Sequence, residues 1–134
     1  ENPDMLPGFI DESIRWVTPV KHFMRIAADD AEIRGQNIKK GDWIMLSYHS
    51  ANQDEEVFEN PSTFDISRKI GQHAAFGYGP HVCLGQHLAR MEMRLLWEEL
   101  LPRLKSVALT SPPQRTRSNF VCGPKSVPVR FELN

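Results

Sequence analysis

The chain has little of the features that assign a protein to a class at first sight. It contains only two cysteines in 134 residues, 16 basic against 17 acidic side chains, and no long apolar run. Two cysteines do not make a disulfide framework, and a formal net charge of −1 gives no reason to expect nucleic acid or an acidic membrane as a partner. A membrane-spanning helix needs about 20 mostly apolar residues, whereas the longest runs here, such as residues 43–46, suit buried strands.

The chain also lacks an initiator methionine before Glu1. We therefore expect it to be one portion of a longer protein, so the absence of a signal peptide carries little weight. Within that portion, 40% hydrophobic and 25% charged residues are ordinary for a globular protein, and the length suffices for one domain with a core.

Two stretches have helical periodicity. The first is predicted to begin at Pro7 and to end at Pro19, with apolar residues at helical spacing between them. The second and longest is predicted over residues 84–104, where apolar side chains cover much of the circumference, so we expect it to be largely buried. Pro102 should stop or kink it.

Short strands, separated by turns, are predicted between these helices and after the second one. They lie at residues 20–28, 32–34, 43–46, 107–109 and 127–132. Residues 47–57 are polar and predict a short helix, while residues 58–75 show no clean period, which is typical of a well-packed functional coil. The predicted fold class is mixed, mainly α with small antiparallel β-sheets.

The most informative stretch is the loop at residues 76–85, Phe-Gly-Tyr-Gly-Pro-His-Val-Cys-Leu-Gly. Gly77 and Gly79 allow a tight turn that other residues would enter only with strain. The loop ends at the start of the long predicted helix, where backbone amides stabilise negative charge. A cysteine held there, Cys83, is expected to be a thiolate, which is either a nucleophile or a metal ligand.

Four roles for Cys83 compete. It could be a buried structural thiol, although a core filler does not need three neighbouring glycines. It could be a nucleophile with His87, on the same helical face, as its base, but no family-specific signature surrounds it. It could join His81 and His87 in a zinc site, for which a fourth ligand is not evident. Finally, it could be the axial thiolate of a haem iron.

The loop resembles the haem-binding signature of the cytochrome P450 superfamily, the haem-thiolate monooxygenases. Five identities carry the likeness, and a chance match in a chain of this length is on the order of 1 in 10,000 or rarer. They are Phe76, Gly77, Gly79, Cys83 and Gly85. The resemblance implies haem b as cofactor, Cys83 as the axial metal ligand and catalytic residue, and a loop, including Leu84, that shapes the pocket under the sulfur. Phe76 would shield the sulfur from water.

Further motifs follow in the order of that family. Residues 12–15, Glu-Ser-Ile-Arg, resemble its Glu-x-x-Arg helix. This likeness implies a structural role for Glu12 and Arg15, which would lock the coil that precedes the cysteine loop. It also implies that Arg25 pairs with a haem propionate, with His81 as a second propionate partner.

One position departs from the family's pattern. Residues 52–68 resemble its irregular meander, where many members have an arginine that completes a triad with the Glu-x-x-Arg pair. Here that position is Thr63. Either Arg68 or His73 could take its place, and the sequence does not decide between them.

Residues 86–90, Gln-His-Leu-Ala-Arg, resemble soluble bacterial members of the family. This implies a cytoplasmic protein whose electron donor is a ferredoxin-type protein with an NAD(P)H-dependent reductase, docking near His87 and Arg90. The implied reaction inserts one oxygen atom from O2 into a small hydrophobic substrate, and residues 20–23 are expected on the substrate side. Neither a nucleic-acid partner nor a membrane segment is expected.

The resemblance covers essentially all of residues 1–134, but only the C-terminal portion of the family's single domain. The long distal helix that serves oxygen activation is not in it, so we expect the isolated chain to be inactive and marginally folded. The alternatives are a non-catalytic haem-binding or redox-sensing remnant and the zinc module. Cys122, which precedes Gly123 and Pro124, is interpreted as a small buried residue near a turn.

Overall fold

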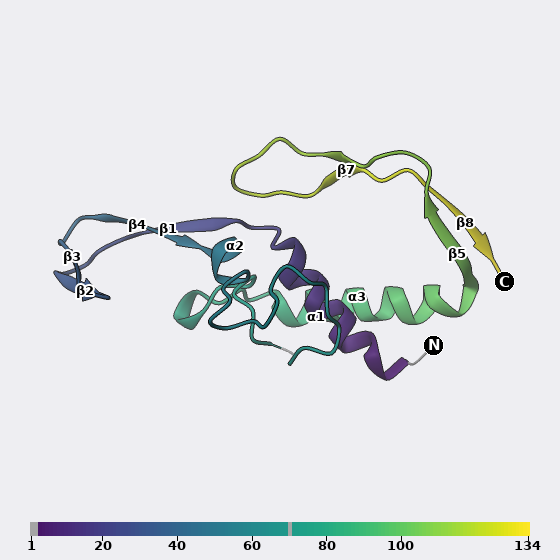
Figure 1. Cartoon of the computed structure of the whole chain (residues 1–134), viewed down its shortest axis with the longest axis horizontal. Helices are drawn as coiled ribbons and strands as arrows, with labels where there is room; N and C mark the ends of the chain where they lie inside the picture. Colours follow the sequence, from purple (N-terminus) through teal and green to yellow (C-terminus); the bar gives the residue numbers. More distant parts are fainter. Residues whose placement is uncertain (1–2, 70) are drawn as a thin grey trace.

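A crossing of two helices forms the centre of the molecule. The computed structural model describes residues 3–69 and 71–134. Helix α1 (Leu6–Val17) crosses helix α3 (Gln86–Leu100), and coil and two-stranded ribbons extend from this crossing (Figure 1). The 3-10 helices beside them are η1 (Pro3–Met5) and η3 (Leu101–Arg103), and a third, η2 (Gly79–His81), lies in the cysteine loop. The predicted mixture of helices and small antiparallel sheets is confirmed.

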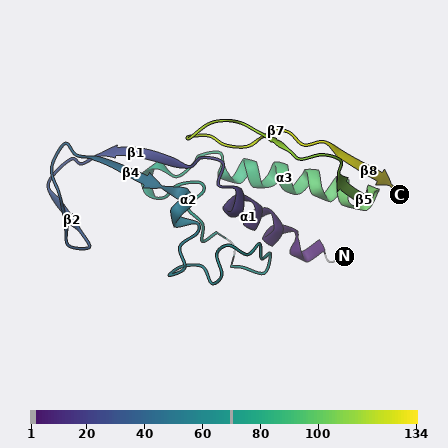
Figure 2. The same cartoon turned by 45° about the horizontal axis from the view of Figure 1, so that its top comes forward.

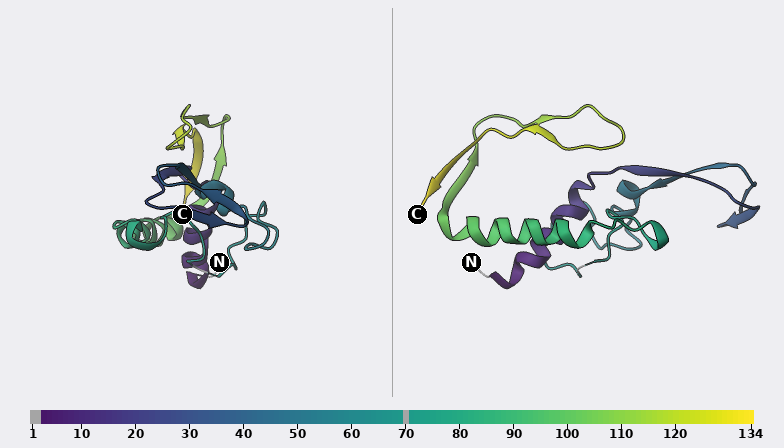
Figure 3. Two further views of the ribbon diagram at one scale, coloured as in Figure 1. Left: turned by 90° about the vertical axis from the view of Figure 1, so that its left-hand side faces the viewer. Right: turned by 180° about the vertical axis from the view of Figure 1, so that it is seen from behind.

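The strands pair as antiparallel ribbons on either side of this crossing. β1 pairs with β4, and the β2–β3 hairpin lies at the far end of that ribbon; after α3, β5 pairs with β8 and β6 with β7. Figure 3 shows the second ribbon rising from the end of α3 and turning back over the helices. The strands are β1 (His22–Ile26), β2 (Ala31–Ile33), β3 (Gln36–Ile38), β4 (Trp43–Ser47), β5 (Leu104–Leu109), β6 (Gln114–Arg115), β7 (Pro124–Ser126) and β8 (Val129–Leu133).

The predicted strands are right in position and incomplete in number. Five observed strands overlap the five predicted ones, but β6 and β7 were not predicted, and β3 forms where a turn was expected. The turn is shorter than expected because Arg34 and Gly35 both have positive φ, 49° and 78°. Two such residues close a hairpin by themselves, which leaves Gln36 paired with Ile33.

Helix α1 begins and ends where its prolines predict. Pro7 lies in the first turn, where its missing N–H costs no hydrogen bond. Thr18, just past the last turn, has a left-handed φ of 40°, and its N–H donates to the carbonyl oxygen of Ile14 at 2.9 Å. Pro19 follows directly and cannot continue the helix.

A small apolar core lies where α1 meets α3. Its buried members are Leu6, Ile10, Ile14 and Ala75, against which Phe9, Phe76, Met93 and Trp97 pack. The rings of Phe9 on α1 and Trp97 on α3 meet edge to face, with their centroids 5.3 Å apart. Because Ala75 and Phe76 belong to this core, the start of the cysteine loop is tied to both helices.

The prediction that the long helix is largely buried is wrong. Within the described chain no residue of α3 is buried, and Leu88 and Leu95 are 53% and 50% exposed. The side of α3 that carries Met93 and Trp97 packs on the core, whereas the apolar stripe through Leu88 and Leu95 stays exposed. The helix does stop before Pro102, as predicted.

Irregular coil leads from the short helix α2 (Tyr48–Ala51) to the cysteine loop, as predicted. Among the described residues between Phe58 and Ala75 there is no helix or strand, yet these two end residues are themselves buried. In the view of Figure 2 this coil lies below α1, and the C-terminal ribbon lies above α3. No helix in the described portion has the length and hydropathy needed to cross a membrane.

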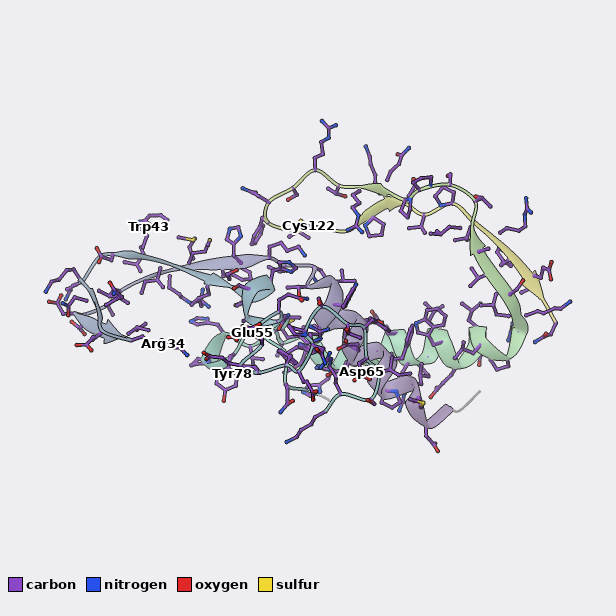
Figure 4. The ribbon with its side chains drawn as sticks, viewed as in Figure 1. Arg34, Trp43, Glu55, Asp65, Tyr78 and Cys122 are labelled. Carbon is purple, nitrogen blue, oxygen red and sulfur yellow. The ribbon has the colours of Figure 1, made fainter. Side chains whose placement is uncertain are left out.

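The C-terminal ribbon returns to the end of α1. Val20 and Val121 form an isolated antiparallel bridge, and the N–H of Cys122 donates to the carbonyl oxygen of Pro19 at 2.8 Å. Cys122, labelled in Figure 4, is half-buried, which corrects the prediction that it is buried. It lies in an irregular part of the ribbon, where its Sγ donates to the carbonyl oxygen of Ser118 at 2.9 Å.

Candidate functional site

Cys83 lies in a loop that backbone hydrogen bonds close on itself. Its N–H donates to the carbonyl oxygen of Phe76 at 2.8 Å, and the N–H of Gly77 donates to the carbonyl oxygen of Ala74, also at 2.8 Å. Gly77 and Gly79 have φ of +73° and +70°, where a side chain would cause strain. The loop is thus built on the two glycines that the sequence singled out, while Gly85 caps α3 with an ordinary φ of −82°.

The surroundings of Cys83 argue against two of its four possible roles. Its side chain is exposed, which contradicts a buried structural thiol. In the ranges that the structure describes, no three His, Cys, Asp or Glu side chains gather closely enough to hold a metal ion. His81, Cys83 and His87 therefore do not form the zinc site considered above. Leu84 and Tyr78 are 98% and 95% exposed on this loop (Figure 4 labels Tyr78).

An open pocket of about 590 Å3 lies beside the loop, a volume typical of ligand sites. Cys83, Phe76 and His81 line it from the loop, and Arg25 lines it from β1. The other lining residues are Ile14, Pro19, Val20, Phe23, Tyr48, Ala75, Ala89 and Met93. The structure thus brings together four site residues named from the sequence, although two distant segments supply them. Gly77, Gly79, Leu84 and Gly85 are not among the lining residues.

The pocket is apolar with a positive edge. Among its described lining residues, Arg25 is charged, His81 offers a ring N–H donor, and none is a carboxylate. The one side-chain hydrogen bond that Arg25 makes within the described chain joins its Nη1 to the carbonyl oxygen of Met24 at 2.9 Å. This set of groups fits haem, because a thiol suits the iron, apolar walls suit the ring, and cations suit its propionates.

Glu12 and Arg15 form a buried, bidentate ion pair behind the pocket. Arg15 Nε and Nη2 donate to the two Glu12 oxygens at 2.7 Å each, and both side chains are 2% exposed. Arg15 also donates to the carbonyl oxygens of Asn52 and Thr63 at 2.6 and 3.4 Å. Glu12 Oε1 accepts the N–H of Asp65 at 2.9 Å. The pair therefore binds the irregular coil to α1.

Arg68, rather than His73, takes the place left open at Thr63. Arg68 Nε lies 3.3 Å from Glu12 Oε1, and its other nitrogens donate to three coil carbonyl oxygens, that of Thr63 among them, at 2.6 to 3.2 Å. Burial would raise the pKa of Glu12, but hydrogen bonds from Arg15 and Asp65 and the charges of both arginines outweigh it and lower this pKa below its usual value. Glu12 is thus held as a carboxylate.

Sequence reasoning missed Asn52, which is fully buried. Its Oδ1 accepts the N–H of Ala74 at 2.7 Å, and its Nδ2 donates to the Thr18 hydroxyl at 2.8 Å. An asparagine in a polar segment carries no sequence signal of burial. It links the end of α1 to the residues directly before the cysteine loop.

A second missed network surrounds Asp11. Its Oδ1 accepts bonds from Arg90 Nε and Nη2 at 3.1 and 2.9 Å and lies 3.2 Å from His73 Nε2, while Oδ2 accepts the N–H of Gly71 at 2.6 Å. His73 Nδ1 accepts the N–H of Ala75 at 3.2 Å, which assigns the ring proton to Nε2. Burial would raise the pKa of Asp11, but hydrogen bonds, chiefly from His73 and Gly71, outweigh it and lower this pKa from 3.8 to about 2.

Arg90 is not the surface charge that the sequence suggested. Its side chain is 26% exposed, pairs with Asp11 and stacks over the Phe76 ring, with the guanidinium carbon 4.7 Å from the ring centroid. Its charge is turned inward because α1 supplies a buried carboxylate at this point. His87, the other residue expected at a docking surface, is exposed.

Comparison with known sequences decides the family. A sequence model described as Cytochrome P450 matches residues 3–131. The chain belongs to the cytochrome P450 family. The resemblance seen in the cysteine loop is thereby confirmed, and with it the family's cofactor, haem b with a cysteine thiolate ligand.

Three bacterial proteins are similar to this cytochrome P450 chain over nearly its whole length. It is 60% identical over 130 residues to Cytochrome P450-terp from a Pseudomonas species, covering 97% of this chain and 30% of that protein. It is 43% identical over 129 residues to linalool 8-monooxygenase from Pseudomonas putida, covering 96% and 32%. The crystal structure of CYP108D1 from Novosphingobium aromaticivorans matches with a TM-score of 0.94 at 51% identity, covering 98% and 32%. The chain thus spans just under a third of the length of these relatives.

Proposed function

We propose that residues 1–134 are the C-terminal portion of a cytochrome P450 monooxygenase and form the thiolate side of its haem site. The observation that carries the proposal is that Cys83, Arg25 and His81 all line the same apolar pocket. When bound, the haem would supply oxygen activation, so that one oxygen atom from O2 enters a C–H or C=C bond of the substrate.

Each site residue has a distinct task in this proposal. Cys83 binds the iron through Sγ, and the bond from its N–H to the Phe76 carbonyl oxygen fixes the backbone that carries the sulfur. With haem bound, Phe76, which lines the same pocket, would shield the sulfur from water. Arg25 and His81 orient the ring through charge-assisted hydrogen bonds to its propionates. The tasks of the loop glycines and of Glu12 and Arg15 are structural.

A small hydrophobic substrate suits the side of the pocket that faces the C-terminal ribbon. Val20 and Phe23 line the pocket there, and the Phe23 ring lies 5.3 Å from the Phe120 ring and 5.9 Å from the Tyr48 ring. Apolar and aromatic walls bind hydrocarbon surface rather than charge. The names of two relatives, linalool 8-monooxygenase and steroid C26-monooxygenase from Mycolicibacterium smegmatis, support this class.

Electrons would come from a ferredoxin-type donor served by an NAD(P)H-dependent reductase. The exposed side of the loop, with Tyr78, Leu84 and His87, is available for such a contact. A cytoplasmic location agrees with the bacterial origin of the relatives named above.

The test is turnover by the haem-loaded holoenzyme in isotopically labelled O2, with ferredoxin, reductase and NADH. Linalool, a steroid and a fatty acid serve as probe substrates. We expect a product that contains one labelled oxygen atom, and none from the Cys83→Ser variant. No product from any probe, although haem is bound through a thiolate, would refute the monooxygenase proposal.

The isolated chain is expected to be inactive in the same assay. The pocket beside Cys83 is open to solvent, so haem bound there would keep one face in water. Turnover by the isolated chain would contradict this expectation.

A further inference from the structure

Arg90 connects a buried carboxylate to the cysteine loop. From the second turn of α3, its Nε and Nη2 donate to Asp11 Oδ1 at 3.1 and 2.9 Å. The same guanidinium lies over the face of the Phe76 ring, 4.7 Å from the centroid. A guanidinium that pairs with a carboxylate at one edge and stacks on an aromatic face has its orientation fixed at two points.

The anchor of Arg90 is itself held firmly. Asp11 is 5% exposed and accepts bonds from the Gly71 N–H and from His73 as well as from Arg90. The side chain of His73 is 3% exposed, and its ring centroid lies 5.7 Å from that of Phe76. Phe76 therefore has the Arg90 cation over one face and the His73 ring beside it.

Phe76 in turn sets the position of Cys83. Its carbonyl oxygen accepts the Cys83 N–H at 2.8 Å, and both side chains line the same pocket. Between them lie the two glycines with positive φ, which give the loop little stiffness of its own. A displacement of Phe76 would therefore move Cys83.

We infer that Arg90 is a positioning residue for the Cys83 thiolate. It acts through the Phe76 ring and is anchored by Asp11 and His73. The inference rests on the proposed function, in which Cys83 ligates haem iron. Arg90 also places a positive charge over the Phe76 ring, which favours the more electron-rich ferrous state of the site.

The helix offers a matched control for this role. Arg94 lies one turn further along α3, where it is 54% exposed and pairs loosely with Glu98 at 3.7 Å. Arg90→Met and Arg94→Met remove the same charge from the same helix. Only the first breaks the contacts to Asp11 and Phe76.

The experiment measures three properties of the haem-loaded holoenzyme for both variants. They are the thermal midpoint, the ferric–ferrous reduction potential, and the rate at which the reduced carbon-monoxide complex loses its thiolate-type Soret band. For Arg90→Met we expect that rate to rise about tenfold or more, the size expected for a partly desolvated cation–π contact, and the potential to fall. For Arg94→Met we expect both to match the unsubstituted protein.

A conservative variant separates positioning from general stability. Arg90→Lys keeps the charge but cannot pair and stack in one geometry. Its reduction potential should therefore return closer to that of the unsubstituted protein than the lifetime of its thiolate band does. Asp11→Asn should shorten that lifetime in the same direction as Arg90→Met. A lower thermal midpoint in Arg90→Met with unchanged potential and band lifetime would overturn the inference.

The Cys83→Ser variant distinguishes a wrong iron ligand from a wrong positioning role for Arg90. If that variant keeps the thiolate-type band, the proposed ligand is wrong and the Arg90 inference falls with it. If it loses the band while Arg90→Met behaves like Arg94→Met, the ligand stands and only the positioning role is refuted.

Discussion

Arg15 donates hydrogen bonds to both carboxylate oxygens of Glu12 at 2.7 Å, and each of the two side chains is only 2% exposed. Asp65 and Arg68 contact the same carboxylate, and the Asn52 carbonyl oxygen binds the same guanidinium. Removing either partner of such a buried pair leaves the other charge without compensation. The pair therefore keeps the coil before the cysteine loop against α1.

Replacing Arg15 with methionine should lower the free energy of unfolding of the holoprotein by about 3–5 kcal/mol, measured by urea denaturation. The matched control is Arg103→Met. Its pair with Glu99 is nearly as short, at 2.8 Å, but the side chains are 71% and 75% exposed, so the loss should be about 0–1 kcal/mol. Similar losses in both variants would show that burial of the pair does not matter.

Asp11 should govern the stability in acid. Its pKa is about 2 in the folded protein and 3.8 ordinarily, so the unfolded chain takes up the proton first as the pH falls. The ionised carboxylate therefore stabilises the fold fully above about pH 5, and this contribution, about 2 kcal/mol, is lost as the pH falls through 3.8 towards 2.

Unfolding free energies measured from pH 6 to about pH 2 test this for Asp11→Asn. The variant should be less stable near neutrality and should show a flatter pH dependence below about pH 5. Asp29→Asn, in the exposed connection between β1 and β2, controls for the loss of any one carboxylate. An Asp11→Asn curve parallel to that of the unsubstituted protein would contradict the prediction.

Alanine at Gly77 should damage the haem site more than alanine at Gly79. Both positions have a left-handed φ, which costs a residue with a Cβ about 1 kcal/mol. At Gly77 the added Cβ would also lie 3.0 Å from the Tyr48 hydroxyl, whereas at Gly79 nothing lies within 4 Å. Gly123→Ala is the control, because nothing lies within 4 Å of the Cβ that it would add. The fraction of haem bound through a thiolate should therefore be highest in Gly123→Ala, lower in Gly79→Ala and lowest in Gly77→Ala. Any other order counts against the loop geometry described.

Arg25→Met should speed haem dissociation about tenfold or more, because a charge-assisted hydrogen bond to a propionate is lost. The ligand would be unchanged, so the spectrum of the haem that remains bound should not shift. Transfer of haem to an excess of apomyoglobin measures the rate. Arg34→Met, which removes an exposed arginine paired with Glu56 at 3.1 Å, should leave it unaltered. Equal rates of haem dissociation in the two variants would show that Arg25 does not bind a haem propionate.

Local chemistry made part of this structure predictable. Pro7 and Pro19 bound the first helix, and the glycines of the cysteine loop adopt the left-handed φ for which glycine is suited. The five identities of the cysteine loop were enough to predict the cytochrome P450 family. Each of these features depends on residues that are neighbours in the chain.

Contacts between distant segments were not predictable in the same way. The threonine at position 63 indicated that the usual partner arginine of the Glu12–Arg15 pair is absent. Only the folded coil shows that Arg68 supplies this positive charge beside Glu12. Asn52 and Asp11 carry no local signal, because a polar residue is buried only where several segments converge on it. Helical periodicity likewise revealed that α3 is apolar, but not which of its sides the described chain covers.

The most direct test of the haem-thiolate assignment is the reduced, carbon-monoxide difference spectrum of the holoprotein, compared with those of Cys83→Ser and Cys122→Ser. Cys122 is half-buried, bonds to Ser118 and does not line the pocket, so its replacement controls for the loss of a thiol. We predict the red-shifted Soret band of thiolate-ligated haem in the unsubstituted protein and in Cys122→Ser, and its loss in Cys83→Ser. A Soret band typical of histidine ligation in the unsubstituted protein, or a thiolate band that persists in Cys83→Ser, would contradict the assignment of Cys83 as the axial ligand.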